Sequence, residues 1–244
     1  MNLFLGFYSI ILAANENFNM ASWLIILAAI FDAFDGKIAR ATKSFSQFGV
    51  EFDSLADVIS FGLAPSFLIY QIQLNQMGPA GLIFSFFPLV FGSIRLARFN
   101  THLSGFEKEN FEGLPIPAAA GTLASFIIFN YNIWHELWIP SLILPLVILV
   151  SLLMVSTIEF DAMPKFNFTS GRKNNILLTL LLISLTLVVF IPQKALFPLA
   201  IIYILYSIFR GLFGVGKNGG ENHAANHRLA EDMDVAMRED REPL

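Results

Sequence analysis

Residues 31–57 read FDAFDGKIARATKSFSQFGVEFDSLAD and place four aspartates, one arginine and two glycines in a chain that is otherwise apolar. Asp32 and Asp35 are three residues apart, and Asp53 and Asp57 are four apart, so each pair would share one face of a helix. Two such helices, joined by a short basic linker, would bring four carboxylates together. Oxygen-rich clusters of this kind suit hard divalent cations such as Mg²⁺ or Mn²⁺.

The composition around this stretch is typical of a membrane protein. Of the 244 residues, 55% are hydrophobic and 14% are charged, whereas ordinary globular domains carry about 25% charged residues. The apolar residues come in long blocks, which favours spanning helices over the alternating pattern of a barrel. The chain has no cysteine, which excludes disulfides and thiol chemistry. No overall basic patch indicates a nucleic-acid partner.

The apolar blocks predict an all-α integral membrane protein with about eight transmembrane helices. The first block is shorter than the roughly 20 residues that a span needs, so we expect the first transmembrane helix to be short or to begin upstream of Met1. Residues 1–212 would form the transmembrane catalytic domain, and residues 213–244 a mobile charged cytoplasmic tail. The predicted spans are about 2–14, 21–41, 53–74, 80–100, 113–132, 138–157, 174–190 and 196–212.

The lysines and arginines predict the orientation of these helices. If the helix with Asp32 ends in the cytoplasm, only Lys194 of the 15 lysines and arginines lies outside, as the positive-inside rule requires. The carboxylates would then lie at the cytoplasmic edge of the cell (inner) membrane, where a nucleotide substrate is available. The other cations are Lys37, Arg40, Lys43, Arg95, Arg98, Lys108, Lys165, Arg172, Lys173, Arg210, Lys217, Arg228, Arg238 and Arg241.

The residues around the aspartates allow a structural and a functional interpretation. The carboxylates could cap solvated helix ends or pair with Lys37, Arg40 and Lys43. Ionisable residues inside membrane segments are costly, however, and mark functional sites. Gly36 and Ala39 would leave room for a ligand against the backbone, or would serve close helix packing. Arg40 could bind a pyrophosphate through paired hydrogen bonds.

The fixed residues of the stretch follow D-x2-D-G-x2-A-R-x8-G-x3-D-x3-D at every position. This pattern resembles the signature of the CDP-alcohol phosphotransferases, integral membrane enzymes of lipid synthesis. The resemblance implies a core of six helices, a homodimer, two divalent cations (Mg²⁺ or Mn²⁺) and a site open to the cytoplasm and the membrane. The roles it implies are metal ligation by Asp32, Asp35, Asp53 and in some members Asp57, general-base catalysis by Asp57, and nucleotide binding by Asp32, Gly36, Ala39 and Arg40.

Stretches further along the chain resemble one branch of that family, the phosphatidylserine synthases. They are EFDSLADVISFGLAPS (51–66), RLARFN (95–100), GLPIPAAAG (113–121) and, less closely, MVSTIEFDAMPKF (154–166). The resemblance implies that CDP-diacylglycerol is the donor and L-serine the acceptor, giving phosphatidylserine and CMP. One departure is that the Pro-Asn-x-x-Thr stretch, which family members usually carry ahead of the first span, does not occur here.

Four downstream polar residues are candidates for binding substrate. Arg95 and Arg98 are three residues apart near the expected cytoplasmic edge, where a guanidinium can bind the serine carboxylate or the lipid phosphate. Both could instead extend towards the interface as ordinary membrane-flanking cations. Asn100 is either a serine contact or a helix-end residue, and Lys165 could bind substrate or an anionic headgroup.

The sequence leaves other functions open. The chain has no cysteine and no visible Ser–His–Asp arrangement, which favours direct attack by the acceptor over a covalent enzyme intermediate. Within the family, the acceptor could be glycerol phosphate or inositol phosphate, and the donor could be an archaeal ether lipid. From a different class, a divalent-cation transport or structural membrane protein could use the same carboxylates, but Arg40 and the fixed glycines would then have no evident purpose.

Overall fold

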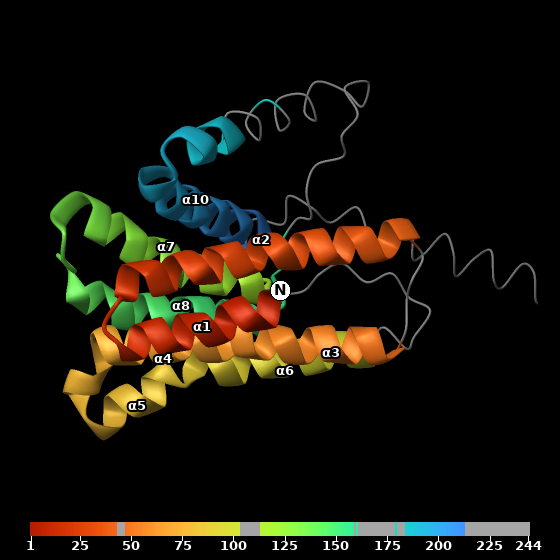
Figure 1. The fold of residues 1–244 in the computed structure, drawn as a ribbon, viewed down its shortest axis with the longest axis horizontal. Coiled ribbons are helices and arrows are strands. Elements are labelled where there is room, and N and C mark those ends of the chain that lie inside the picture. Colours follow the sequence, from red (N-terminus) through yellow and green to blue (C-terminus); the bar gives the residue numbers. More distant parts are fainter. Residues whose placement is uncertain (43–46, 103–112, 159, 161–178, 180–183, 213–244) are drawn as a thin grey trace, which may run out of the picture.

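The structure, a computed structural model, describes residues 1–42, 47–102, 113–158, 160, 179 and 184–212. Within these ranges the chain is helical and contains no strand. Figure 1 shows the helices side by side in a bundle, with α2 (Phe18–Thr42) and α3 (Gln47–Asp57) extending beyond the others at one end. The predicted tail at 213–244 lies outside the described residues.

Five helical stretches of the described chain are long and apolar enough to cross a membrane, and two shorter apolar helices accompany them. The chain is therefore an all-α membrane protein, as the composition predicts. Of the predicted seventh span, residues 179 and 184–190 are described, and they are helical. The five long stretches are Phe18–Ile38, Phe48–Ile72, Pro79–Asn100, Ile116–Trp134 and Pro192–Gly211, and the shorter ones are Asn2–Ala14 and Pro140–Met154.

The third span begins earlier than the sequence predicts and changes its pitch midway. It consists of α3, the π-helical η1 (Val58–Leu63) and α4 (Ala64–Ile72). The prediction began this span at Asp53, whereas the helix begins at Gln47. Two aromatic rings one turn apart, Phe48 and Phe52, stack with their centroids 6.0 Å apart and support the added turn. Asp53 therefore lies inside the helix rather than at its start.

The predicted fourth helix, 80–100, is broken into two. It consists of α5 (Pro79–Ser85) and α6 (Phe87–His102). Pro88 accounts for the break, because a proline offers no backbone N–H and its ring clashes with the carbonyl four residues earlier. Before α5, the short 3₁₀ helix η2 (Leu74–Met77) ends at Gly78, whose φ of 60° makes the corner towards α5.

The GLPIPAAAG stretch leads into α7 (Ile116–Trp134), with its prolines at the start of the helix as expected. The stretch is tied to the end of α8 (Ile143–Met154), because the Leu114 N–H donates to the Leu153 carbonyl at 2.9 Å. Gly113 has a φ of 79°, and a Cβ there would lie 3.0 Å from the Met154 carbonyl carbon, so only glycine fits.

The last two predicted spans also differ in their bounds. The sixth, expected over 138–157, consists of η3 (Pro140–Leu142) and the shorter α8. The eighth, α10 (Pro192–Leu212), begins four residues before the predicted 196, because proline suits the first turn of a helix. Its Phe197 ring packs against Phe126 of α7 at 5.1 Å between centroids. Through this contact α10 joins the bundle.

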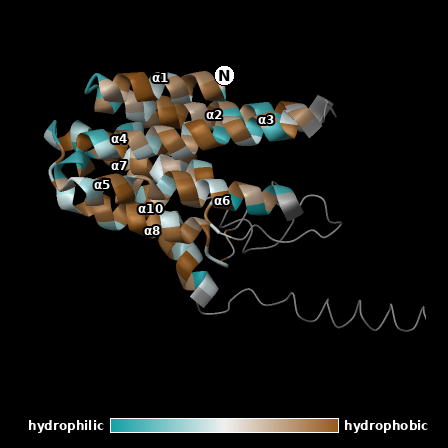
Figure 2. Cartoon of the chain, turned by 90° about the horizontal axis from the view of Figure 1, so that it is seen from below, coloured by the Kyte–Doolittle hydropathy of each residue, from teal (hydrophilic) through white to brown (hydrophobic). Residues whose placement is uncertain are grey.

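Helix α1 (Asn2–Ala14) is packed closely enough on η1 to place its own start beside the aspartates. A Cβ on Gly6 would lie 2.6 Å from the Ser60 Cα, so the two backbones approach as only a glycine allows. On its other side, the Ser9 hydroxyl donates to the Ala21 carbonyl of α2 at 2.8 Å. Figure 2 shows hydrophilic residues in α3 and towards the end of α6, and again in the turns at the opposite end of the bundle, while apolar residues dominate between them.

Candidate active site

Three of the four motif aspartates meet between α2 and α3. Asp32 from α2 and Asp53 and Asp57 from α3 each offer a carboxylate oxygen, and these oxygens lie within 4.8 Å of one another. Asp35 is exposed and is not in this group, although it is close enough to interact electrostatically with Asp53. The site therefore has a compact part of three carboxylates, with a fourth beside it.

The three carboxylates differ in depth. Asp57 is only 9% exposed, Asp32 is half-buried and Asp53 is exposed. Asp32 precedes the end of its span at Ile38 by six residues, and Asp53 follows the start of its span at Phe48 by five. At 1.5 Å per residue, both lie about 8 to 9 Å inside the end of the apolar span. The carboxylates thus run from the exposed Asp53, near the ends of α2 and α3, to the buried Asp57.

Asp57 is held in place by the first residues of α1. The Asn2 amide nitrogen Nδ2 donates to Asp57 Oδ1 at 2.8 Å, and the Ser60 hydroxyl donates to the Asn2 carbonyl at 3.1 Å. These bonds link α1, the end of α3 and η1 into one buried unit. Sequence reasoning did not single out Asn2 or Ser60. The sequence signal was weak. It consisted of one polar residue, Asn2, at the start of an apolar helix, and a glycine, Gly6, one turn later on the same face.

The π-helical η1 begins at the residue after Asp57. Wide helical turns of this kind are rare and occur frequently at functional sites. The turn brings α6 close, because a Cβ on Gly62 would lie 3.4 Å from the Leu89 Cα. Helix α6 carries the candidate Arg95, so this close approach of α6 to η1 brings Arg95 towards the buried Asp57.

Arg95 is a buried cation beside Asp57. It is 9% exposed, and its Nε has no hydrogen-bond partner among the described residues. Its guanidinium lies near enough to the Asp57 carboxylate and to the hydroxyl of Tyr203 on α10 to interact with both electrostatically. A buried donor without a partner is uncommon in folded proteins and calls for a specific explanation. A bound anion would provide the missing acceptor.

The other candidate residues are placed less deeply or lie outside the description. Arg98 Nη1 donates to the Val155 carbonyl at 3.4 Å, and Asn100 Nδ2 donates to the Ser54 hydroxyl at 3.0 Å, so both tie the end of α6 to neighbouring segments. Gly36 faces open space, because a Cβ at this position would meet no described atom within 4 Å. The side chains of Ala39 and Arg40, and all of Lys165, lie outside the described part of the chain.

The carboxylate group fits a hard divalent cation. Its donors are all carboxylate oxygens, the type that Mg²⁺ and Mn²⁺ prefer. Oxygens that share one Mg²⁺ at about 2.1 Å lie at most about 4.2 Å apart. The observed limit of 4.8 Å is slightly wider, so a small closing of the side chains would complete a site. Asp32, Asp53 and Asp57 could hold such an ion.

Comparison with known proteins assigns the chain to a family. The sequence profile of CDP-alcohol phosphatidyltransferases matches residues 1–153, which include α1 to α7 and most of α8. The chain belongs to the CDP-alcohol phosphatidyltransferase family, a class that an all-helical membrane bundle with this aspartate motif predicts.

Within that family, three relatives of the chain have serine in their names. The chain is 40% identical over 214 residues, 87% of its length and 88% of the relative, to a CDP-diacylglycerol–serine O-phosphatidyltransferase of Helicobacter pylori. It is 37% identical over 193 residues, 78% of its length and 84% of the relative, to the protein of that name in Methanocaldococcus jannaschii. An archaetidylserine synthase of Methanothermobacter thermautotrophicus is 40% identical over 162 residues, 66% of each chain.

We expect Asn2→Ala to lower the turnover number about tenfold while leaving the Michaelis constants nearly unchanged. The amide bond to Asp57 involves a charged acceptor, and bonds of that kind contribute roughly 1.5–3 kcal/mol. Steady-state kinetics of the purified protein would measure the effect, with Asn19→Ala on the exposed start of α2 as the matched control. A proportional loss of kcat and of folded protein would show that Asn2 only stabilises the fold.

Proposed function

We propose that the chain transfers a phosphatidyl group from CDP-diacylglycerol to L-serine, giving phosphatidylserine and CMP. The observation that carries the proposal is the group of three carboxylates whose oxygens lie within 4.8 Å of one another, with Asp57 and the nearby Arg95 both buried. Family membership supports the donor, and the names of the similar proteins support the acceptor.

In the proposed reaction, Asp57 is the general base. It takes the proton from the serine hydroxyl, the hydroxyl oxygen attacks the lipid-bearing phosphorus, and the bond from that phosphorus to the CMP oxygen breaks. The deep position of Asp57, and the Asn2 amide that orients it, keep its carboxylate aimed at one place. Because the acceptor oxygen attacks directly, no covalent enzyme intermediate is needed.

The remaining aspartates, in this proposal, hold two divalent cations, Mg²⁺ or Mn²⁺. Asp32, Asp35 and Asp53 are the ligands, with Asp57 near enough to contribute. At such a site, divalent cations polarise a pyrophosphate and stabilise the charge on the leaving group. Gly36 together with Ala39 and Arg40 of α2 would bind the cytidine diphosphate portion, on the side of the helix that Asp32 shares.

Arg95 is the proposed contact for the carboxylate of serine. Its guanidinium lies near enough to Asp57 to interact with it electrostatically, so an acceptor bound between them would have its hydroxyl near the base. The Nε that lacks a partner in the described structure would donate to the ligand. Arg98 and Lys165 are further candidates for contacts with the lipid phosphate, and Asn100 for a contact with the acceptor.

In the proposed orientation, the protein lies in the inner membrane, and the ends of α2 and α3 near the exposed Asp53 face the cytoplasm. The orientation rests on the cations, because Lys194 at the start of α10 and Arg210 near its end would lie on opposite sides. The chain has no cysteine, so single cysteines can be introduced cleanly. A membrane-impermeant maleimide should label Lys194→Cys in intact cells, and Arg210→Cys only after permeabilisation; the reverse pattern would overturn the orientation.

A homodimer is also part of the proposal, on the strength of family resemblance. Light scattering of the purified protein in detergent, corrected for bound detergent, would measure the protein mass against the 27.2 kDa of one chain. A mass near twice that value supports a dimer, and a mass of one chain removes it.

The acceptor assay tests the central proposal. Purified protein is incubated with CDP-diacylglycerol, Mn²⁺ and labelled serine, and CMP release and labelled lipid are measured. Glycerol phosphate and inositol phosphate replace serine in parallel reactions. Serine-dependent release of CMP supports the proposal, and release only with another acceptor would assign a different member of the family. Folded protein that moves Mg²⁺ across liposomes without turning over CDP-diacylglycerol would place the chain outside this chemistry.

The donor lipid has one specific alternative, an archaeal ether lipid. It is favoured by the similarity to an archaetidylserine synthase, whose level of identity equals that of the Helicobacter pylori relative. The assay with an ether-linked CDP-archaeol beside CDP-diacylglycerol would separate the two donors. A kcat/KM at least tenfold higher for the ether lipid would replace the diacyl donor in the proposal.

We expect Gly36→Ala to weaken nucleotide binding about tenfold without destabilising the fold. No described atom lies within 4 Å of the added methyl group, so it would occupy only the space proposed for the ligand. Calorimetric titration with CDP in the presence of Mn²⁺ would measure the affinity, and a thermal melt the stability. The control is Gly121→Ala in α7, where the nearest atom is Ile26 Cδ1 at 3.9 Å. Unchanged CDP affinity would remove Gly36 from the nucleotide site.

A further inference from the structure

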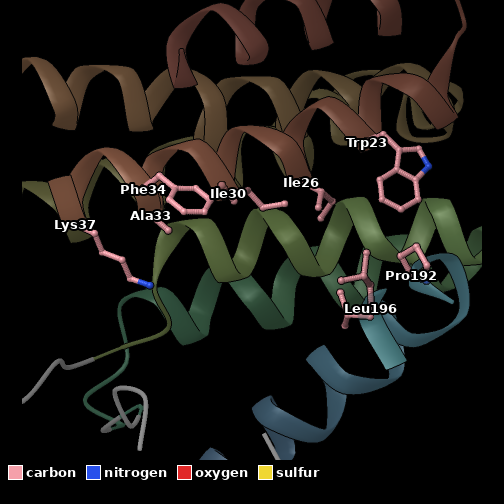
Figure 3. Close-up of a pocket in the computed structure, with 10 residues that line it drawn as sticks. Trp23, Ile26, Ile30, Ala33, Phe34, Lys37, Pro192 and Leu196 are labelled. Atoms are coloured by element: carbon pink, nitrogen blue, oxygen red, sulfur yellow. The ribbon is translucent and has the colours of Figure 1, made fainter. Parts of the chain in front are cut away.

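A cavity lies on the side of α2 away from the aspartates and has no role in the proposed reaction. It has a volume of about 470 Å³, within the range of roughly 300–1,000 Å³ that is usual for small-molecule sites. Figure 3 shows the α2 side chains in a row along the cavity, with Pro192 and Leu196 of α10 opposite the end where Trp23 and Ile26 lie. The lining residues are Trp23, Ile26, Ala29, Ile30, Ala33, Phe34, Lys37, Val188, Pro192 and Leu196.

The cavity faces away from the aspartates. The α2 residues that line it recur every three or four positions from Trp23 to Lys37, so they form one face of the helix. At 3.6 residues per turn, the centre of that face lies about 140° around the helix from Asp32. A ligand in this cavity would therefore be separated from the carboxylates by the body of α2, and its own phosphorus would not be the one that reacts.

The chemistry of the cavity changes along its length. Its lining is apolar except at one end, where Lys37 contributes an ammonium group; Trp23 lies at the other end. Lys37 is the residue before the last of the apolar span Phe18–Ile38, so its charge lies at the membrane boundary. The 14 residues from Trp23 to Lys37 correspond to about 21 Å of helix. One leaflet has about 15 Å of hydrocarbon, so this length accommodates an acyl chain and its glycerol backbone.

We propose that this cavity binds an anionic phospholipid of the surrounding bilayer, with an acyl chain along α2 and its phosphate at Lys37. Lipid chains fill an apolar groove at this depth in a membrane without leaving polar groups unpaired, and a cation at the boundary selects an anionic headgroup. The lipid is a bound neighbour rather than the donor. This inference depends on the membrane placement of α2 and is independent of which acceptor the protein uses.

Trp23 provides a direct probe of the site. The chain has three tryptophans, so Trp134→Phe with Trp138→Phe leaves Trp23 as the single fluorophore. The full-length protein is placed in nanodiscs of phosphatidylcholine, and phosphatidylglycerol with brominated acyl chains is titrated in. We expect quenching of Trp23 at about fivefold lower mole fraction than with brominated phosphatidylcholine, since one lysine near the surface favours an anionic lipid by about that factor.

Two pairs of variants test the two ends of the proposal. Lys37→Gln should remove the preference for phosphatidylglycerol, whereas Lys194→Gln, an exposed lysine of α10, should keep it. Ala33→Phe should reduce quenching by both lipids, because the ring would fill the cavity, whereas Ala80→Phe in α5 should not. Thermal melts establish that each variant is folded, and Lys37→Gln carries the test if Ala33→Phe is not.

Three results would overturn the proposal. Equal quenching by the two brominated lipids, unchanged in Lys37→Gln, would show that the cavity holds unselected bilayer lipid. Relief of phosphatidylglycerol quenching by equimolar CDP-diacylglycerol would assign the cavity to the donor. Protection of Trp23 from both lipids in a form of doubled protein mass would assign it to a second copy of the chain.

Discussion

Asp57→Asn is expected to lower the rate of CMP release from CDP-diacylglycerol and serine by roughly 10²- to 10⁴-fold, the usual contribution of a positioned general base. Asparagine has nearly the shape of aspartate, and its Oδ1 can still accept the bond that Asn2 donates at 2.8 Å. It cannot take a proton from the serine hydroxyl. Because the residue is only 9% exposed, water cannot readily replace the carboxylate as base.

Comparing CDP affinity with turnover in Asp57→Asn distinguishes a general base from a metal ligand. Asp57→Asn should keep its affinity for CDP with Mn²⁺ within about threefold, because Asp32, Asp35 and Asp53 remain, while turnover is lost. Glu51→Gln on the exposed face of α3 makes the same carboxylate-to-amide change one and a half turns away and should leave both quantities unchanged. An Asp57→Asn protein with more than a tenth of normal activity would remove the base assignment.

The aspartate motif was readable from the sequence because its geometry is local. A spacing of three or four residues determines which side chains share a helix face, whatever the rest of the fold does. The two helices are joined by a short linker, so their aspartates had to meet. What local spacing could not predict was the order of depth, with Asp57 buried and Asp53 exposed. That order comes from α1 and α6, which pack on η1 through Gly6 and Gly62.

Contacts between residues far apart in the chain could not be predicted either, because residue spacing determines only local geometry. Asn2 and Asp57 are 55 positions apart. Arg95 interacts electrostatically with Tyr203, which lies on a helix outside the part of the chain that matches the family profile. The spans themselves were predicted from their apolar length. Their ends and breaks depended on finer features, such as the π-helical turn of η1 and the interruption before Pro88. Hydrophobicity averaged over a window does not respond to a single proline or a changed pitch.

Arg95→Gln is expected to lower kcat/KM for serine by roughly 10- to 100-fold, as the loss of a hydrogen bond to a charged group would produce. The arginine is nearly as buried as Asp57, and its Nε has no partner within the described residues. If serine supplies the missing acceptor, the change appears mainly in the KM for serine. The KM for CDP-diacylglycerol should change by less than about threefold, because the donor is bound by residues of α2.

Arg98→Gln is the matched control for this prediction. Arg98 lies one turn further along α6 and donates to the Val155 carbonyl at 3.4 Å. Its removal therefore loosens the end of a helix and leaves the surroundings of Asp57 unchanged. We expect its KM for serine to rise less than threefold. Arg95→Lys should recover part of the loss, since an ammonium keeps the charge but lacks the paired donors of the guanidinium. If Arg95→Gln raises the KM for the donor and leaves that for serine unchanged, Arg95 binds the lipid phosphate, and the serine carboxylate must be held by another residue.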